Sequence, residues 1–198
     1  MDVQPRLYDH ILQDCFAGHR QMVFISGPRE VGKNTTCRLI GTHYLSWDDV
    51  ADRRLILRGP GAVAEHVRLE PLLERIPLIV FAELHKHRKW REFLKGFFEV
   101  SGPRMRVIVT GSPQLDIVPR SGDSLMGRYA CFRMHPWSVG ECVRVAVGDS
   151  MVQPPEPIAD ADWSALLEHG GFPEPFLKRD ARFTRRWHSL RQEQLVLA

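Results

Sequence analysis

The sequence predicts an α/β fold in which a parallel sheet is covered by helices on both faces. Two observations predict it. Short, continuous apolar segments, such as residues 77–82 and 106–110, alternate with segments whose apolar residues have helical spacing. Apolar strands that alternate with amphipathic helices are typical of a parallel sheet buried on both faces. The chain of 198 residues is long enough for one such domain with a short appendage.

The composition excludes intrinsic disorder and a membrane-spanning chain. Hydrophobic residues make up 43% and charged residues 26% of the sequence, which is the globular range. The apolar runs are far too short to span a bilayer, and Met1 and Asp2 begin no basic and apolar leader. The 4 cysteines lie far apart without a CxxC pair, which is typical of reduced thiols. We therefore expect a cytoplasmic protein with no membrane partner.

The first part of the chain alternates helices and strands. The expected elements are a helix over residues 6–17, a strand over 21–26, a helix over 33–41, a strand over 44–47, a helix broken at 58–61 and another helix to about residue 75. Asp48 and Asp49 suit the start of the third helix, because carboxylates accept hydrogen bonds from its free amides.

The second part continues this pattern and then changes. The expected elements are a strand over residues 77–82, a basic amphipathic helix over 89–100, strands over 106–110 and 130–134, and helical pieces around Gly170 and Gly171, the last from residue 174 to the end. A proline-rich stretch at residues 153–157 indicates a linker. We accordingly predict a main domain over residues 1–150, a linker over 151–158 and a small helical segment over 159–198.

A glycine-rich loop between the first strand and the second helix carries the clearest chemistry. Residues 27–33 match the first seven positions of the phosphate-binding P-loop, G-x-x-x-x-G-K-[ST], in the strand–loop–helix context that this motif requires. Glycines let the backbone amides face phosphate oxygens, and the helix start adds free N–H groups. The alternative, a turn that binds nothing, fits this context less well. The predicted nucleotide-binding residues are Gly27, Pro28, Arg29, Glu30, Val31, Gly32, Lys33, Asn34 and Thr35.

Two positions that normally support Mg²⁺ are altered. The eighth loop position should be Ser or Thr, whose hydroxyl coordinates the ion, and here it is Asn34, which we predict to be a weak metal ligand. Thr35 cannot replace it, because one helical step turns its side chain by about 100°. The buried strand over residues 77–82 should end in Asp and ends in Ala82. The loop is therefore expected to hold phosphate and to support the metal poorly.

The chain resembles prokaryotic AAA-type P-loop ATPases that carry a C-terminal domain of unknown function. The matching segments follow in order and begin at Gly27, Tyr44, Val80, Val109, Gly122, His135 and Gly170. The resemblance implies a three-layer α/β/α P-loop NTPase fold with a five-stranded parallel AAA-type sheet. It also implies ATP or ADP and Mg²⁺ as ligands. The family usually extends further, so residues 159–198 are expected to lead into a missing C-terminal domain; natural truncation, an isolated domain and a decayed gene all remain open.

The resemblance also assigns roles to single residues. Glu83 matches the glutamate that activates water, and Thr110 or Ser112 matches the polar sensor near the γ-phosphate. Arg128 is the candidate for an arginine that reaches a phosphate, in the same chain or from a neighbouring subunit, with an ordinary surface arginine as the alternative.

Three functions follow from these residues. The first is an AAA-type ATP-binding protein whose ATP hydrolysis is possible but impaired. The second is a nucleotide-binding pseudo-ATPase that serves as an interaction module. The third is a DNA-associated basic module with a vestigial P-loop, because Arg182, Arg185 and Arg186 share one helical face and could contact phosphates. Nucleotide is the expected partner, a homo-oligomer stays open, and nucleic acid is not favoured.

Overall fold

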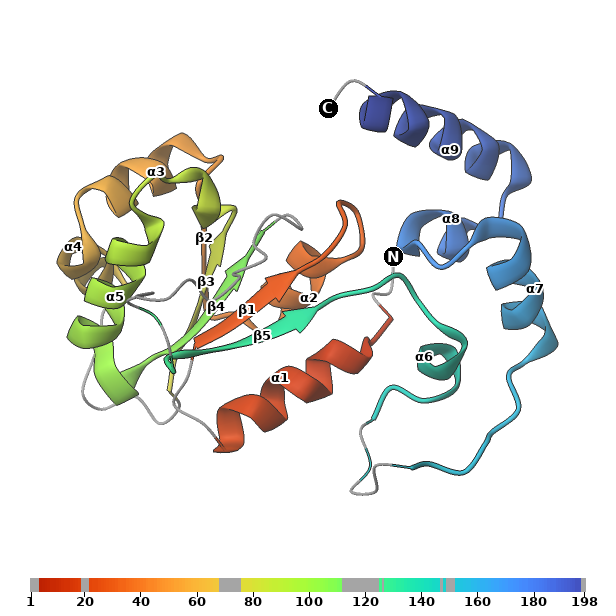
Figure 1. Cartoon of the computed structure of the whole chain (residues 1–198), viewed down its shortest axis with the longest axis horizontal. Coiled ribbons are helices and arrows are strands. Elements are labelled where there is room, and N and C mark those ends of the chain that lie inside the picture. Colours follow the sequence, from red (N-terminus) through yellow and green to blue (C-terminus); the bar gives the residue numbers. More distant parts are fainter. Residues whose placement is uncertain are drawn as a thin grey trace.

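The computed structural model describes residues 4–18, 22–67, 76–111, 125, 127–146, 148 and 152–196. Within them, a five-stranded sheet has the order β2-β3-β4-β1-β5, and every neighbouring pair is parallel. The strands are β1 (Met22–Ser26), β2 (His43–Ser46), β3 (Leu78–Ala82), β4 (Arg106–Thr110) and β5 (Tyr129–Arg133). Figure 1 shows this sheet at the centre of the main domain.

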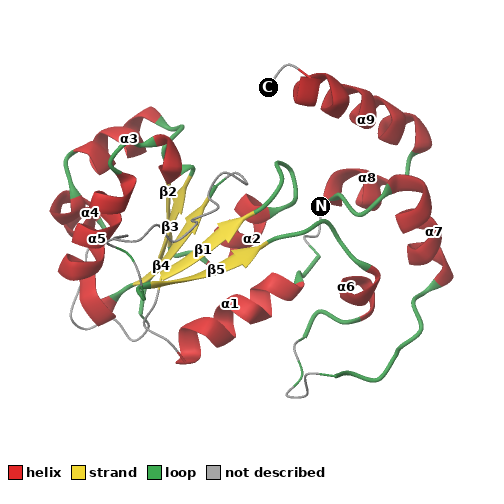
Figure 2. Cartoon of the chain, viewed as in Figure 1, coloured by secondary structure: helices red, strands yellow, loops and turns green. Residues whose placement is uncertain are grey.

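In the described part of the chain, five helices cover the two faces of the sheet: α1 (Leu7–Gly18), α2 (Lys33–Ile40), α3 (Val50–Leu57), α4 (Pro60–His66) and α5 (Trp90–Ser101). The described helices that follow β5 are α6 (Val139–Val143), α7 (Asp160–His169), α8 (Pro173–Lys178) and α9 (Ala181–Val196), and short 3-10 turns lie at Leu84–Lys86 and Gly102–Arg104. Side chains alternate between the faces of a strand. Phe24 accordingly packs with α3, α4 and α5, and Val23 packs with α1 and α2. The three layers are visible in Figure 2.

The predicted fold class, a parallel sheet covered by helices, is confirmed. Val23 of β1 lies opposite Ile108 of β4, and Val80 of β3 lies on the far side of Ile108. Their side chains are 0% exposed. Continuous apolar strands form a parallel sheet here because both faces are buried under helices.

The predicted helix from residue 174 to the end is wrong in one respect. It is divided into α8 and α9 at Arg179, whose backbone is left-handed with φ 50°. The Asp180 carboxylate then accepts a hydrogen bond from the amide of Phe183 at 2.7 Å, which caps the start of α9. The far end of the helix predicted to reach residue 75 lies outside the described residues, and the short α6 was not predicted.

The C-terminal segment, α7 to α9, packs beside the loop end of the main domain (Figure 1). Residues 152–159 lead into it without regular secondary structure. The amide of Trp137 donates to the carbonyl of Gly171 at 2.7 Å, and the Trp137 ring packs edge-on against Phe176 of α8. A Cβ atom at Gly171 would lie 2.1 Å from the Trp137 carbonyl oxygen, so glycine is required where the two parts meet.

Candidate functional site

The phosphate loop, residues 27–33, joins the carboxyl end of β1 to the start of α2. Gly27 and Gly32 have φ angles of 146° and 102°, which side chains rarely tolerate. Space is also limiting, because a Cβ atom at Gly27 would lie 2.3 Å from the carbonyl oxygen of Met134. Both predicted glycines therefore shape the loop.

Lys33 is drawn into the loop. Its side chain is 7% exposed, and its ammonium donates to the carbonyl oxygens of Gly27 at 2.8 Å and Pro28 at 2.6 Å. Burial lowers the pKa of this ammonium, and the negative charge of Glu83 opposes that shift. The loop thus holds a desolvated cation, which an anion would stabilise.

A cavity of about 530 Å³ opens over the loop. Its walls come from the N-terminal residues, the phosphate loop, the start of α2, the end of β3 and α8. The lining residues are Gln4, Arg6, Arg29, Glu30, Gly32, Lys33, Asn34, Thr35, Thr36, Glu83, Trp137, Pro173, Glu174 and Leu177. Small-molecule sites commonly occupy cavities of this size, with apolar walls and a few placed polar groups.

The residues at the metal positions do not fit Mg²⁺. The carboxamide oxygen of Asn34 accepts a hydrogen bond from the hydroxyl of Thr110 at 3.4 Å. Ala82 is 1% exposed and lies in register between Ser46 and Thr110. Mg²⁺ favours carboxylate and hydroxyl oxygens held in octahedral geometry, and the end of β3 supplies no carboxylate at this position.

Glu83 borders the cavity at the end of β3. Its backbone is left-handed with φ 56°, and its amide donates to the Thr110 carbonyl at 2.9 Å. Its carboxylate lies 3.4 Å from the Lys86 ammonium and 3.9 Å from His85 Nε2. This places the predicted water-activating carboxylate beside the loop and holds it with a lysine.

Lys86 is itself paired twice. Its ammonium also donates to both carboxylate oxygens of Asp48 at 2.8 and 2.7 Å, close to the carboxyl ends of β2 and β3. Burial alone would lower the pKa of Lys86, but its bonds and charge interactions with Asp48 and Glu83 raise it above the ordinary value. Lys86 therefore stays charged and fixes the Glu83 side chain from one side.

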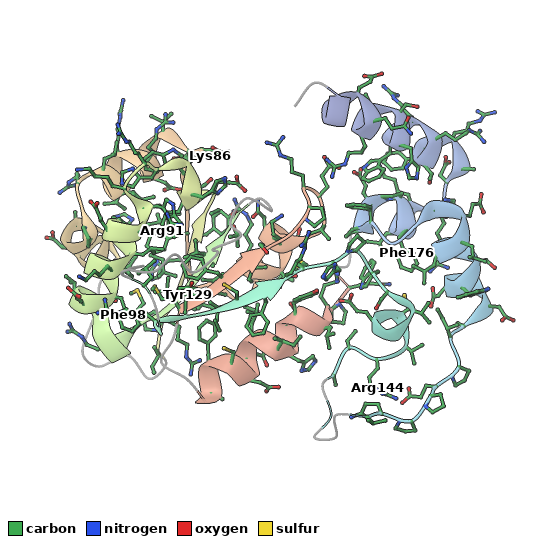
Figure 3. All side chains as sticks on the ribbon, in the orientation of Figure 1. Lys86, Arg91, Phe98, Tyr129, Arg144 and Phe176 are labelled. Atoms are coloured by element: carbon green, nitrogen blue, oxygen red, sulfur yellow. The ribbon has the colours of Figure 1, made fainter. Side chains whose placement is uncertain are left out.

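The remaining predicted site residues are Thr110, Ser112 and Arg128. Thr110 lies where it was expected, at the carboxyl end of β4, and Ser112 lies outside the described residues. Arg128 precedes the amino end of β5, pairs with Glu99 at 3.2 Å and lies 5.9 Å from the ring of Phe98, which Figure 3 labels. The phosphate loop follows the opposite ends of the strands, so the structure does not bring Arg128 to the phosphate loop of its own chain. Contact from a neighbouring subunit stays a prediction.

Residues of α9 reach the loop, which the sequence did not predict. The indole N–H of Trp187 donates to the Glu30 carboxylate at 3.1 Å, and Arg191 Nε lies 3.6 Å from the same carboxylate. Arg191 also donates to the Arg29 carbonyl at 2.5 Å. Both residues lie in the same helix as Arg182, Arg185 and Arg186, but helical spacing alone does not show which part of the protein a helical face contacts.

The chain was compared with known protein families and with curated proteins. Residues 19–143 match the model of the AAA domain family, which is more than half of the chain. The chain belongs to the AAA domain family. This confirms the resemblance to AAA-type P-loop ATPases. No curated protein shows a significant match.

Among solved structures, this AAA domain is similar to the Orc1 protein of Aeropyrum pernix, which was solved in complex with DNA. The two are 16% identical with a TM-score of 0.46. The match covers 72% of this chain and 48% of the Orc1 chain, so this chain spans about half the length of that protein. Separately, the described helices include none that is both long and apolar enough to cross a membrane.

Proposed function

We propose that this AAA domain binds ATP or ADP at the phosphate loop and hydrolyses ATP slowly or not at all. One observation carries the proposal. The buried Lys33 and the glycine-shaped loop border a cavity of about 530 Å³, while Asn34 and Ala82 stand where side chains would support Mg²⁺. The site thus keeps the groups that would bind phosphate and lacks the side chains that would support Mg²⁺.

The cavity offers different chemistry along its length. Phosphates would accept hydrogen bonds from the loop amides and charge from Lys33. Towards α8 the walls are formed by Trp137, Pro173 and Leu177, whose apolar surfaces suit a nucleotide base. The donor set therefore fits a nucleotide, with its phosphates at the loop and its base against the C-terminal segment.

Hydrolysis would rest on fewer groups. In P-loop enzymes Mg²⁺ bridges the β- and γ-oxygens and neutralises the charge that develops there. In this chain Lys33 borders the cavity beside Arg6 and Arg29, and Glu83 is available to orient a water molecule. Without side chains suited to the metal, we expect slow turnover, and complete absence of turnover would make the protein a pseudo-ATPase.

The alternative of a DNA-associated module has its own support on α9. Arg182, Arg185 and Arg186 are exposed and lie on the same helical face. A basic face that neutralises DNA phosphates loses affinity steeply as salt rises. Measured DNA affinity with a steep salt dependence, together with no ADP binding, would favour this alternative.

Calorimetric titration of ADP, with and without Mg²⁺, tests the proposal. We expect saturable binding whose dissociation constant changes by less than about tenfold with the metal, equivalent to about 1.4 kcal/mol. Lys33→Met should abolish the heat signal. A larger gain with Mg²⁺ would show that the ion is held by other groups and would count against impaired metal support.

A further inference from the structure

We propose that Arg6 is a positioning residue that fixes the phosphate loop in its phosphate-binding shape, with Glu141 as its anchor. This inference rests on the proposed binding of nucleotide at the loop. Arg6 lies just before α1, far from the loop in sequence, and is 5% exposed. Its guanidinium borders the same cavity as Lys33.

The hydrogen bonds of the Arg6 guanidinium join the loop to two other parts of the domain. Nη1 donates to the Val31 carbonyl at 2.8 Å. Nη2 donates to the His135 carbonyl at 2.9 Å. Nε and Nη2 donate to the Glu141 carboxylate at 2.6 and 3.1 Å. Only a planar, multi-donor group can span three acceptors in this way.

The bond to Val31 sets the direction of a loop amide. The Val31 side chain is buried in the core at 0% exposure, so this residue is held from both sides. In a trans peptide the C=O and N–H groups point in opposite directions. Because the Val31 carbonyl faces Arg6, the amide of Gly32 in the same peptide points away from the guanidinium, and Gly32 lines the cavity.

The other cations near the loop cannot provide the same fixed support. Lys33 holds the carbonyls of Gly27 and Pro28, but its ammonium must leave them to meet a phosphate. Arg191 holds the Arg29 carbonyl from α9, and its guanidinium is shared with Glu30. Arg6 is instead locked by a carboxylate, Glu141, that is itself 5% exposed.

The same guanidinium reaches the C-terminal segment through Trp137. It lies 4.9 Å from the Trp137 ring, and the Trp137 amide binds Gly171 at 2.7 Å. An ion pair that only stabilises the fold would also join the main domain to the C-terminal segment. The stabilising role and the positioning role of Arg6 must therefore be separated by experiment. Removal of one partner of a buried ion pair leaves an unpaired charge, whereas replacement of both by apolar residues often restores stability.

The test compares Arg6→Met, Glu141→Leu and the double variant by thermal unfolding and ADP titration. We expect the Arg6→Met and Glu141→Leu variants to unfold at lower temperature, and the double variant to regain much of that loss. The ADP dissociation constant of the double variant should still be raised about tenfold or more, equivalent to about 1.4 kcal/mol, because Val31 has lost its donor. Faster hydrogen exchange of the amides of residues 28–33 should accompany it.

Two further variants sharpen the comparison. Ile79→Val removes a methylene from the core on the face covered by α5 and should lower thermal stability while leaving ADP affinity unchanged. Arg6→Lys keeps a charge for Glu141 but cannot span the three acceptors, and should weaken ADP binding about fivefold or more. It carries the test if the other variants fail to fold.

The results separate the positioning role of Arg6 from the proposed binding of nucleotide. Recovery of both stability and ADP affinity in the double variant, or wild-type affinity in Arg6→Lys, would overturn the positioning role alone. If the unaltered chain does not bind ADP, the proposed function and this inference both fall.

Discussion

Asn34 and Thr110 meet at the carboxyl end of the sheet, where the Thr110 hydroxyl lies 3.4 Å from the carboxamide oxygen of Asn34. Ala82 lies directly opposite Thr110 in the sheet register. Asn34 therefore stands where P-loop enzymes carry a Ser or Thr hydroxyl, and Ala82 stands where they carry an Asp carboxylate. The weak support for Mg²⁺ that we propose would then be a local property of two residues, and we expect it to be reversible.

The first prediction concerns repair of these positions. Asn34→Thr together with Ala82→Asp should raise the ATPase rate at saturating Mg²⁺ by at least about tenfold, or about 1.4 kcal/mol of activation free energy. The rate increases of the two single variants should together fall short of the increase in the double variant, because the two side chains serve one ion and their effects are non-additive. Steady-state phosphate release by the wild type, both single variants and the double variant would measure this.

Two results would contradict that account. Robust wild-type turnover that Lys33→Ala abolishes would show that the metal is held another way. An inert double variant that still binds ATP would place the defect elsewhere, such as in an arginine supplied by a neighbouring subunit.

The second prediction separates binding from stability at Lys33. Burial disfavours the charged form of this lysine, so Lys33→Met should relieve a desolvation cost while removing the phosphate-binding charge. We expect unfolding free energy to stay within about 1 kcal/mol of wild type and ADP binding to be lost. Urea denaturation beside ADP titration would test both, and a strongly destabilised variant would mean that Lys33 mainly holds the Gly27 and Pro28 carbonyls.

Local sequence pattern predicted the sheet and the loop because both depend on neighbours in the chain. Apolar strands and the Gly27 to Lys33 spacing are short-range signals, as is Asp49, which caps α3 by accepting from the amides of Ala51 and Asp52. The site depends on longer contacts as well. Arg6 and Glu141 are 135 residues apart, and no periodicity relates them.

Other features of the fold also depend on contacts that the sequence does not show. Arg128 follows a motif of the family, but the sequence does not show at which end of the sheet its side chain lies. The break at Arg179 was missed because a non-glycine residue adopts a left-handed backbone there. Trp187 and Arg191 follow the basic face of Arg182, Arg185 and Arg186 in sequence, and the fold turns them towards Glu30, a contact that helical spacing does not show.

The third prediction concerns the contact between the main domain and α7 to α9. Gly171→Ala should destabilise the protein by roughly 1–3 kcal/mol, because the added methyl group would overlap the Trp137 carbonyl and must displace backbone. ADP affinity should fall as well, since Trp137 and α8 form one wall of the cavity. The matched control is Gly61→Ala, where a Cβ atom meets nothing within 4 Å. Equal stability of the two variants, measured by urea denaturation, would show that the segment docks without Gly171.

The last prediction is that stability decreases as the pH falls below about 6.5. Burial is the largest cause that lowers the pKa of His43, His85 and His87 from the ordinary value of 6.5 in the folded protein. The unfolded chain therefore binds protons that the folded chain does not, between pH 6.5 and the lower folded pKa values. Stability from these groups is complete above pH 6.5 and is lost as the pH falls through that window. Urea denaturation at pH 8.0, 6.5 and 5.5 should show this decline, and His43→Gln with His87→Gln should reduce its slope. A wild-type stability that rises on acidification, or a double variant with an unchanged slope, would show that other groups control the pH dependence.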